Sequence, residues 1–240
     1  LEAAKRLGKA VRWVGERTEH FLVDNHGRAN SVHAEMAMDE SGRFLAIRID
    51  LKADMGAYTH QFGVAIPWFG AAMATGVYDI PVLDFHLTGV FTNTTQSGPY
   101  RGAGRPEAAM AIELAIDKAA RELGRDRVEL RRRNIIPEDA FPFQTGMTFL
   151  YDCGAFERGM DMTLELADVD GYPARKDASE AKGLLRGIGI INAIEQAAGV
   201  LDDGAEIRFN ADGTATVFVG SDNHGQGHAT VFRQLLADRL

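Results

Sequence analysis

Alternation of hydrophobic and polar positions predicts a β-hairpin in the first quarter of the chain. Residues 31–38 alternate, residues 43–53 alternate again, and the Asp39–Gly42 stretch between them has turn chemistry. Strands are also predicted at residues 82–92 and, more briefly, at 11–14, whereas residues 16–20 form a charged turn.

A period of three to four residues predicts helices in the middle of the chain. The longest begins at Pro106, a residue suited to a first helical turn, and ends at Gly124. A second begins with a capping box at Asp126 and Glu129 and runs through Arg133. Shorter helical patterns cover residues 67–74, 156–167 and 173–182, and one starts at residue 229.

The arginine run at the end of the second helix, Arg131 to Arg133, allows two interpretations. Three arginines could bind phosphate. More often such a run is a solvated helix end that complements the helix dipole, and we expect this here.

The last third predicts a long apolar strand at 183–198 and a hairpin formed by 205–210 and 214–220. Hairpins separated by helical blocks, without βαβ regularity, indicate an α+β fold of mixed, hairpin-rich sheets with packed helices. The proline- and aromatic-rich stretch at 137–146 suggests a boundary, with one domain at 1–137 and a second at 138–240.

Composition narrows the function classes. The 240 residues carry a formal charge of -8, which disfavours a general nucleic-acid surface, and no apolar run is long enough for a membrane span. The single cysteine, Cys153, excludes an internal disulfide framework and favours a cytoplasmic location. Because the chain starts at Leu1 inside a helical pattern, we expect it to be a piece of a longer polypeptide.

Two glycine-rich turns, each between a strand and a helix, are the candidate sites. The first, Gly98 to Glu107, contains Arg101, whose fork of donors suits an anionic or carbonyl-rich group, and the helix start behind it is expected to offer free N–H groups. The second places Gln226 between two glycines, where its amide could contact the edge of a heterocycle. Plain strand-to-helix connections explain both turns equally well on local grounds.

Three other kinds of site fit less well. His224 and His228 have zinc-like spacing, but glycines lie between them and no acidic base accompanies them. The first turn lacks the third glycine of a dinucleotide-binding motif, and Glu107 in its place would repel a pyrophosphate. Cys153, beside an aspartate, has no activating neighbour and is expected to be an inert thiol.

The chain resembles the molybdenum-binding large subunit of the xanthine dehydrogenase, aldehyde oxidase and aerobic carbon monoxide dehydrogenase family. The stretch from Thr94 to Ala108 resembles the active-site loop of that family. Four further landmarks follow the family's order: Ala53–Tyr58, Tyr78–Pro81, Leu130–Asn134 and Gly225–Thr230.

The resemblance implies a cofactor, partners and site residues. The cofactor would be molybdenum held by molybdopterin, commonly as the cytosine dinucleotide in bacteria. Electrons would pass to iron–sulfur (2Fe-2S) clusters and FAD on partner subunits or domains, and the complete complex would be a dimer. The molybdenum and substrate pocket would be lined by Tyr100, Arg101, Gly102, Ala103 and Gly104. The pterin or its phosphate would be held by Gly225, Gln226, Gly227 and His228.

Departures from the family's pattern limit the substrate. The loop lacks the cysteine that binds copper in carbon monoxide dehydrogenases, so it resembles the form II variant, and Ala103 offers no ring to stack on a purine. The resemblance therefore implies hydroxylation of an aldehyde or an N-heterocycle. The family's general-base glutamate is absent here, and Glu107 and Glu195 are not assigned its role, so the fragment alone is expected to be inactive. A non-catalytic structural or assembly paralogue is the alternative.

Overall fold

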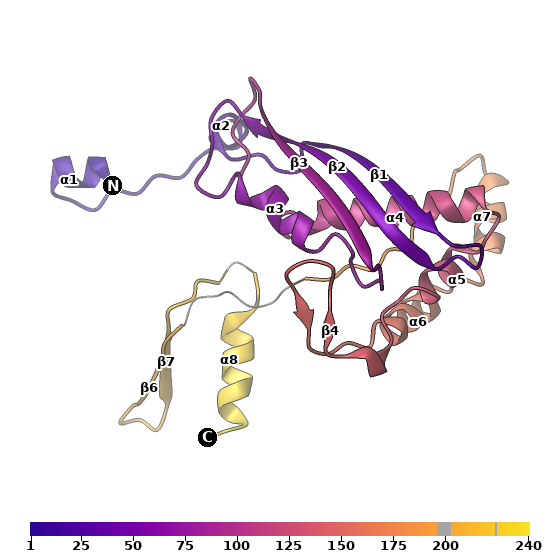
Figure 1. Cartoon of the computed structure of the whole chain (residues 1–240). Helices are drawn as coiled ribbons and strands as arrows, with labels where there is room; N and C mark the ends of the chain where they lie inside the picture. The colour runs from indigo at the N-terminus through magenta and orange to yellow at the C-terminus, as the bar shows by residue number, and fades with distance from the viewer. Residues whose placement is uncertain (196–202, 224) are drawn as a thin grey trace. The chain divides into compact units, whose positions relative to one another are not determined.

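The computed structural model describes residues 1–195, 203–223 and 225–240 (Figure 1). The chain forms two compact units, residues 1–195 and 196–240. The helices and strands of the first unit are α1 (Glu2–Leu7), α2 (Arg17–Val23), β1 (Asn30–Met38), β2 (Phe44–Gly56), α3 (Ala65–Ala72), β3 (Val82–Phe91), α4 (Arg105–Glu122), α5 (Arg127–Arg132), a 3-10 turn (Glu138–Ala140), β4 (Phe143–Gln144), β5 (Leu150–Tyr151), α6 (Phe156–Leu166) and α7 (Tyr172–Glu180). Those of the second are β6 (Ala205–Phe209), β7 (Ala215–Val219) and α8 (His228–Ala237).

The predicted first hairpin and the α+β class are confirmed. β1 pairs antiparallel with β2, and β3 pairs parallel with the other edge of β2, so the sheet order is β1-β2-β3. A parallel pair needs a crossover connection, and α3 lies in that connection (Figure 1).

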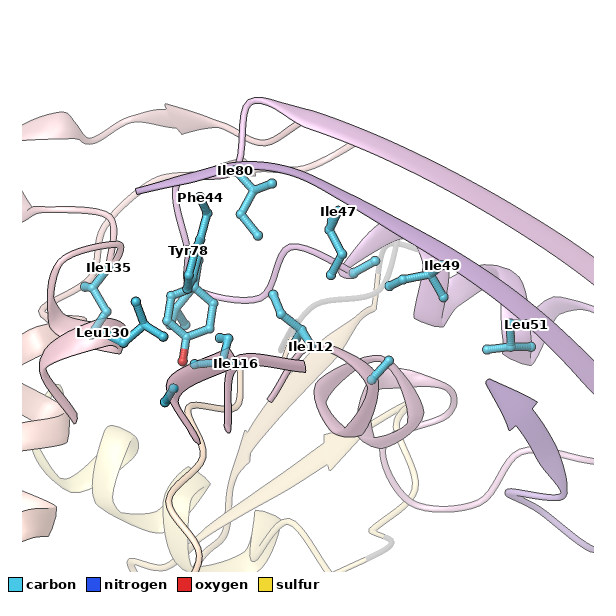
Figure 2. Packing of buried hydrophobic residues seen from close by; sticks show 14 of the residues in the cluster. Phe44, Ile47, Ile49, Leu51, Tyr78, Ile80, Ile112, Ile116, Leu130 and Ile135 are labelled. Atoms are coloured by element: carbon cyan, nitrogen blue, oxygen red, sulfur yellow. The ribbon is translucent and has the colours of Figure 1, made fainter. Parts of the chain in front are cut away.

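The core of the first unit lies between this sheet and α4. Ile47 and Ile49 of β2 are at most 1% exposed and point toward Ile112 of α4 (Figure 2). The opposite face of β2 is charged: Arg48 is exposed and donates to Asp84 over 2.8 Å. Period-two alternation therefore separates a buried face from a solvated one.

Arg131 contradicts the expectation of a solvated arginine run. Its side chain is fully buried and forms ion pairs with Glu113 at 2.7 Å and Asp117 at 2.8 Å, both on α4. Glu113 also accepts from the hydroxyl of Tyr78 at 2.6 Å and from the backbone N–H of Asn192 at 3.0 Å. Burial raises the pKa of Tyr78, which stays protonated as a donor. This buried network joins α4, α5 and the segment around Asn192.

Two further positions around α5 have structural roles. Asp126 caps the helix by accepting from the N–H groups of residues 128 and 129 at 2.7 and 2.9 Å. The buried Asn134 accepts from the N–H of Phe44 at 2.8 Å and donates to the carbonyls of Gly42 and Leu130. Asn134 thereby fixes the turn of the first hairpin to the end of α5.

The strand predicted at 183–198 is not formed in its described part. Residues 184–195 have no ladder partner, and residues 196–198 lie outside the described residues. Instead the segment follows α4 and α5, and the side chains of Arg105 and Glu195 form an ion pair at 3.2 Å. Arg127 donates to the carbonyl of Ile188 at 3.1 Å, and Glu113 accepts from the N–H of Asn192 at 3.0 Å. Side chains on two helices thus satisfy backbone groups that a neighbouring strand would otherwise satisfy.

Two predictions for the N-terminal region are wrong. Residues 11–14 form no strand, and Trp13 there is 67% exposed. Residues 16–20 belong not to a turn but to the entry of α2, where Glu16 and Glu19 form a reciprocal capping box that stabilises the first turn.

The second unit contains the predicted hairpin of β6 and β7, paired antiparallel, and the predicted final helix α8. Among the described residues of both units, no helix is both long and apolar enough to cross a membrane.

Candidate functional site

The first glycine turn has an unusual backbone. Gly102, Ala103 and Gly104 all have positive φ, at 89°, 41° and 95°. L-residues rarely adopt this region, which explains the two glycines. The turn is closed by bonds of its own: Ala103 N–H donates to the carbonyl of Tyr100 at 2.7 Å, and Arg105 N–H to that of Gly102 at 2.9 Å.

The start of α4 is not the open anion site expected from the sequence. The Arg105 N–H is used within the turn, Pro106 has no N–H, and the Ala108 N–H donates to Gly104. The carboxylate of Glu107 occupies the first helical turn and is 7% exposed. Negative charge there suits the helix dipole, so the chain itself supplies the anion.

Gly104 is required by packing within the chain. A Cβ at this position would lie 2.1 Å from the carbonyl oxygen of Ile66 and 2.7 Å from the nitrogen of Gly70, both on α3. A glycine in a ligand-binding turn permits close approach of the ligand to the backbone. At Gly104 the close approach is by α3.

Arg28, which the sequence analysis did not single out, contacts the same turn. Its guanidinium donates to Glu107 at 2.9 Å and to the backbone carbonyl of Arg101, and it lies 5.2 Å from the ring centre of Tyr100. The pairing neutralises Glu107, so the repulsion inferred from its sequence position does not apply. A lone arginine before a strand gives no pattern that could have revealed this contact.

Asp54, at the end of β2, ties the strand to the segment that leads into the turn. It accepts from the hydroxyls of Thr92 and Thr94 at 2.6 and 3.1 Å and from the N–H of Gly56 at 2.7 Å. These hydrogen bonds, that of Thr92 first, lower the pKa of Asp54.

Replacing Asp54 with asparagine is expected to destabilise the unit in a pH-dependent way. Because the folded state lowers the pKa of Asp54, its contribution to stability is present above the unfolded value of about 3.9 and is lost as pH falls through the folded value. Urea unfolding of both proteins at about pH 6 and about pH 3 checks this. The difference in free energy of unfolding between wild type and variant should be smaller at the lower pH. An equal difference at both pH values would contradict the lowered pKa of Asp54.

The side chains of Tyr100 and Arg101 are exposed, while the backbone of the turn is held by hydrogen bonds. Tyr100 is 66% exposed. The guanidinium of Arg101 makes no hydrogen bond or ion pair with any residue in the described part of the chain. Just before the turn, Oε1 of Gln96 is buried without a hydrogen-bond partner among the described residues. A buried acceptor of this kind calls for a partner from outside.

The second glycine turn has related features in its own unit. Gly225 and Gly227 have φ values of 105° and 77°, and the Gly227 N–H donates to Asn223 at 3.2 Å. His228 is the first residue of α8, and its ring stacks on that of Phe232 with 4.9 Å between the ring centres. The Nδ1 atom of His228 is buried without a hydrogen-bond partner among the described residues. Gln226 is exposed. At the start of α8 the N–H groups of Thr230 and Val231 donate to the carbonyl of Gly227 at 3.0 Å, which leaves those of His228 and Ala229 as the first N–H groups of the helix.

Taken separately, each turn offers hydrogen-bonding groups that suit a polar, anionic heterocycle such as a pterin. The first turn supplies an arginine and an acceptor from Gln96, and the second supplies an amide, an imidazole nitrogen and a helix N-terminus. The two turns belong to different units.

The zinc and thiol alternatives concern His224, His228 and Cys153. His224 lies outside the described residues, which contain no group of three metal-binding side chains. Asp152 raises the pKa of the exposed Cys153 thiol, so this side chain is a weak nucleophile, as the sequence analysis expected.

Comparison with known families identifies the class. The chain belongs to the molybdopterin cofactor-binding domain family, whose models match residues 1–135 and 162–240. The resemblance drawn from the five landmarks is therefore confirmed, and the chain corresponds to a segment of a molybdopterin-binding large subunit.

Individual relatives agree with this assignment. The chain is 32% identical to the nicotine 6-hydroxylase large subunit of Paenarthrobacter nicotinovorans, over 99% of this chain and 31% of that protein. It is also 32% identical to the carbon monoxide dehydrogenase large chain of Hydrogenophaga pseudoflava, over 98% of this chain and 31% of that protein. The crystal structure of quinoline 2-oxidoreductase from Pseudomonas putida 86 superimposes with a TM-score of 0.81 at 27% identity, over 99% of this chain and 32% of that one. The chain thus spans about a third of the length of these relatives.

Proposed function

We propose that the protein containing this chain is a molybdenum hydroxylase that hydroxylates an N-heterocycle or an aldehyde with oxygen derived from water. The observations that carry the proposal are two buried polar atoms without a hydrogen-bond partner among the described residues, Oε1 of Gln96 beside the first glycine turn and Nδ1 of His228 beside the second. Within each unit, a bound polar heterocycle would satisfy the atom beside that turn. The loop lacks a copper-binding cysteine, and relatives named for nicotine and quinoline oxidation favour the N-heterocycle.

In this proposal the chain binds and orients, and the cofactor supplies the redox chemistry when bound. Gln226, Gly225, Gly227 and His228 would hold the pterin or its phosphate, and the cofactor would be the cytosine dinucleotide form. Tyr100, Arg101 and the Gly102–Gly104 backbone would line the substrate pocket, where the Arg101 cation would attract a carbonyl oxygen or ring nitrogen. The general base would come from a residue outside this chain.

The proposal extends to partners and organisation. Relatives named as large subunits or large chains support an assembly with further subunits. In our proposal those subunits carry FAD and iron–sulfur clusters, and the complex is dimeric and cytoplasmic. We also place the boundary between the two molybdopterin-binding domains after residue 137. The first family model ends at residue 135 and the second begins at residue 162, which is compatible with that position.

Replacing Gln226 or Arg101 with alanine is expected to separate cofactor binding from substrate turnover. Loss of the Gln226 amide should lower the molybdenum and pterin content of the purified complex about fivefold or more, because a polar contact to the cofactor is lost. Loss of Arg101 should slow turnover of a panel of N-heterocycles and aldehydes while leaving the metal content unchanged.

Gln234→Ala, on the exposed face of α8, is the matched control for Gln226 and should retain full metal content. Wild-type metal content and turnover in both site variants would refute the site assignment. A non-catalytic paralogue would contain no metal even in the wild type.

A further inference from the structure

The segment before β1 runs alongside the first glycine turn. The N–H of His26 donates to the carbonyl of Gln96 at 3.1 Å, and the N–H of Gly98 donates to the carbonyl of His26 at 2.9 Å. The amide of Gln96 donates to Asn25 at 2.8 Å. The two backbone hydrogen bonds form an isolated parallel β-bridge between His26 and Ser97, which brings Arg28, at the end of the segment, against the turn.

Arg28 joins the two ends of the turn. One guanidinium nitrogen donates to Glu107 in the first turn of α4, and another donates to the backbone carbonyl of Arg101. A planar guanidinium can hold two acceptors in fixed directions at once, which an ammonium cannot do. The ring of Tyr100 packs against the same guanidinium.

The side-chain contacts of Arg28 concentrate on the turn and the helix start behind it. In the described part of the chain the hydrogen bonds and the ring contact of its guanidinium all reach residues between Tyr100 and Glu107. Arg28 itself has a φ of 66°, which is uncommon for a residue with a side chain and persists only where the surroundings fix it. None of its partners belongs to the hydrophobic core cluster.

We propose that Arg28 is a positioning residue that holds the glycine turn in the shape that presents Tyr100 and Arg101 to the cofactor and substrate. It acts through the backbone of Arg101 and through Glu107. That the turn faces a molybdenum pocket rests on the proposed function, whereas the bracing of the turn by Arg28 does not.

Hydrogen exchange of the full-length subunit, purified with its partners, tests this proposal together with molybdenum content. In Arg28→Met, peptides covering residues 98–105 should exchange about tenfold faster or more, because a charge-assisted contact to two acceptors is lost. Peptides from β2 and the C-terminal half of α4 should exchange as in wild type, and molybdenum content should fall. Arg28→Lys should give intermediate exchange, since lysine is a point charge without the fork. Arg48→Met, which removes an exposed arginine with two carboxylate partners, is the control and should change neither readout.

Unchanged exchange of residues 98–105 in Arg28→Met would overturn the positioning role. Equal acceleration in β2 and throughout α4 would also overturn it, because Arg28 would then stabilise the whole unit. If the turn opens as expected but the wild-type complex contains no molybdenum, the proposed function fails while the positioning role stands.

Discussion

Methionine at Arg131 should lower the free energy of unfolding of the first unit by about 3–5 kcal/mol, the range found when one partner of a buried ion pair is removed. The side chain of Arg131 is fully buried, and its partners Glu113 and Asp117 are 2% and 17% exposed. Without the cation, two carboxylates would stay close together with little solvent to screen them. Urea unfolding followed by circular dichroism measures the change.

The neighbouring arginine provides the control. Arg132 contacts three carboxylates, those of Glu129, Glu157 and Asp161, but these are 49–69% exposed. Exposed ion pairs contribute only about 0–1 kcal/mol, so Arg132→Met should have a much smaller effect than Arg131→Met. Equal effects of the two substitutions would show that burial does not determine how much these ion pairs contribute to the free energy of unfolding.

Gly104→Ala should lower the free energy of unfolding of the first unit by roughly 3–5 kcal/mol. Alanine would be strained at this positive φ, and its Cβ would collide with α3, against which the turn is closely packed. The added Cβ would lie 2.1 Å from a backbone carbonyl oxygen of α3, and backbone cannot rotate away as a flexible side chain can. The turn should shift, and molybdenum content of the full complex should fall with it. Unfolding and metal analysis measure the two consequences.

The substitution Gly124→Ala separates the effect of backbone strain from that of the steric contact with α3. Gly124 follows the other end of α4 with a φ of 63°, and nothing lies within 4 Å of a Cβ placed there. Gly124→Ala therefore carries the backbone strain alone, about 1–3 kcal/mol, and should leave the metal content unchanged. If Gly104→Ala costs no more than Gly124→Ala, the packing of the turn on α3 is not what requires glycine.

Local patterns in the sequence were sufficient for the elements whose partners lie nearby. The hairpin of β1 and β2 follows from alternation and a turn, and α4 follows from its apolar period and Pro106. Each of these two sequence patterns is contained within a stretch of about twenty residues. The segment at 183–195 shows where this fails: its apolar composition predicts a strand, but its described backbone groups contact Glu113 and Arg127.

The first glycine turn was predictable from the sequence, whereas the contacts that hold it in place were not. The glycines and Arg101 mark the first turn because their chemistry is local, whereas Arg28 reaches it from 73 residues away. The burial of Arg131 likewise depends on carboxylates 14 and 18 residues earlier. No pattern around an arginine distinguishes a solvated side chain from one that meets such partners only after folding.

Metal analysis of the intact wild-type complex decides whether this chain helps to hold a molybdenum cofactor. The full-length subunit, co-purified with its partners, should contain about one molybdenum and one pterin, because each large subunit would bind a single cofactor. A folded and complete complex that contains neither molybdenum nor pterin would contradict a role in cofactor binding.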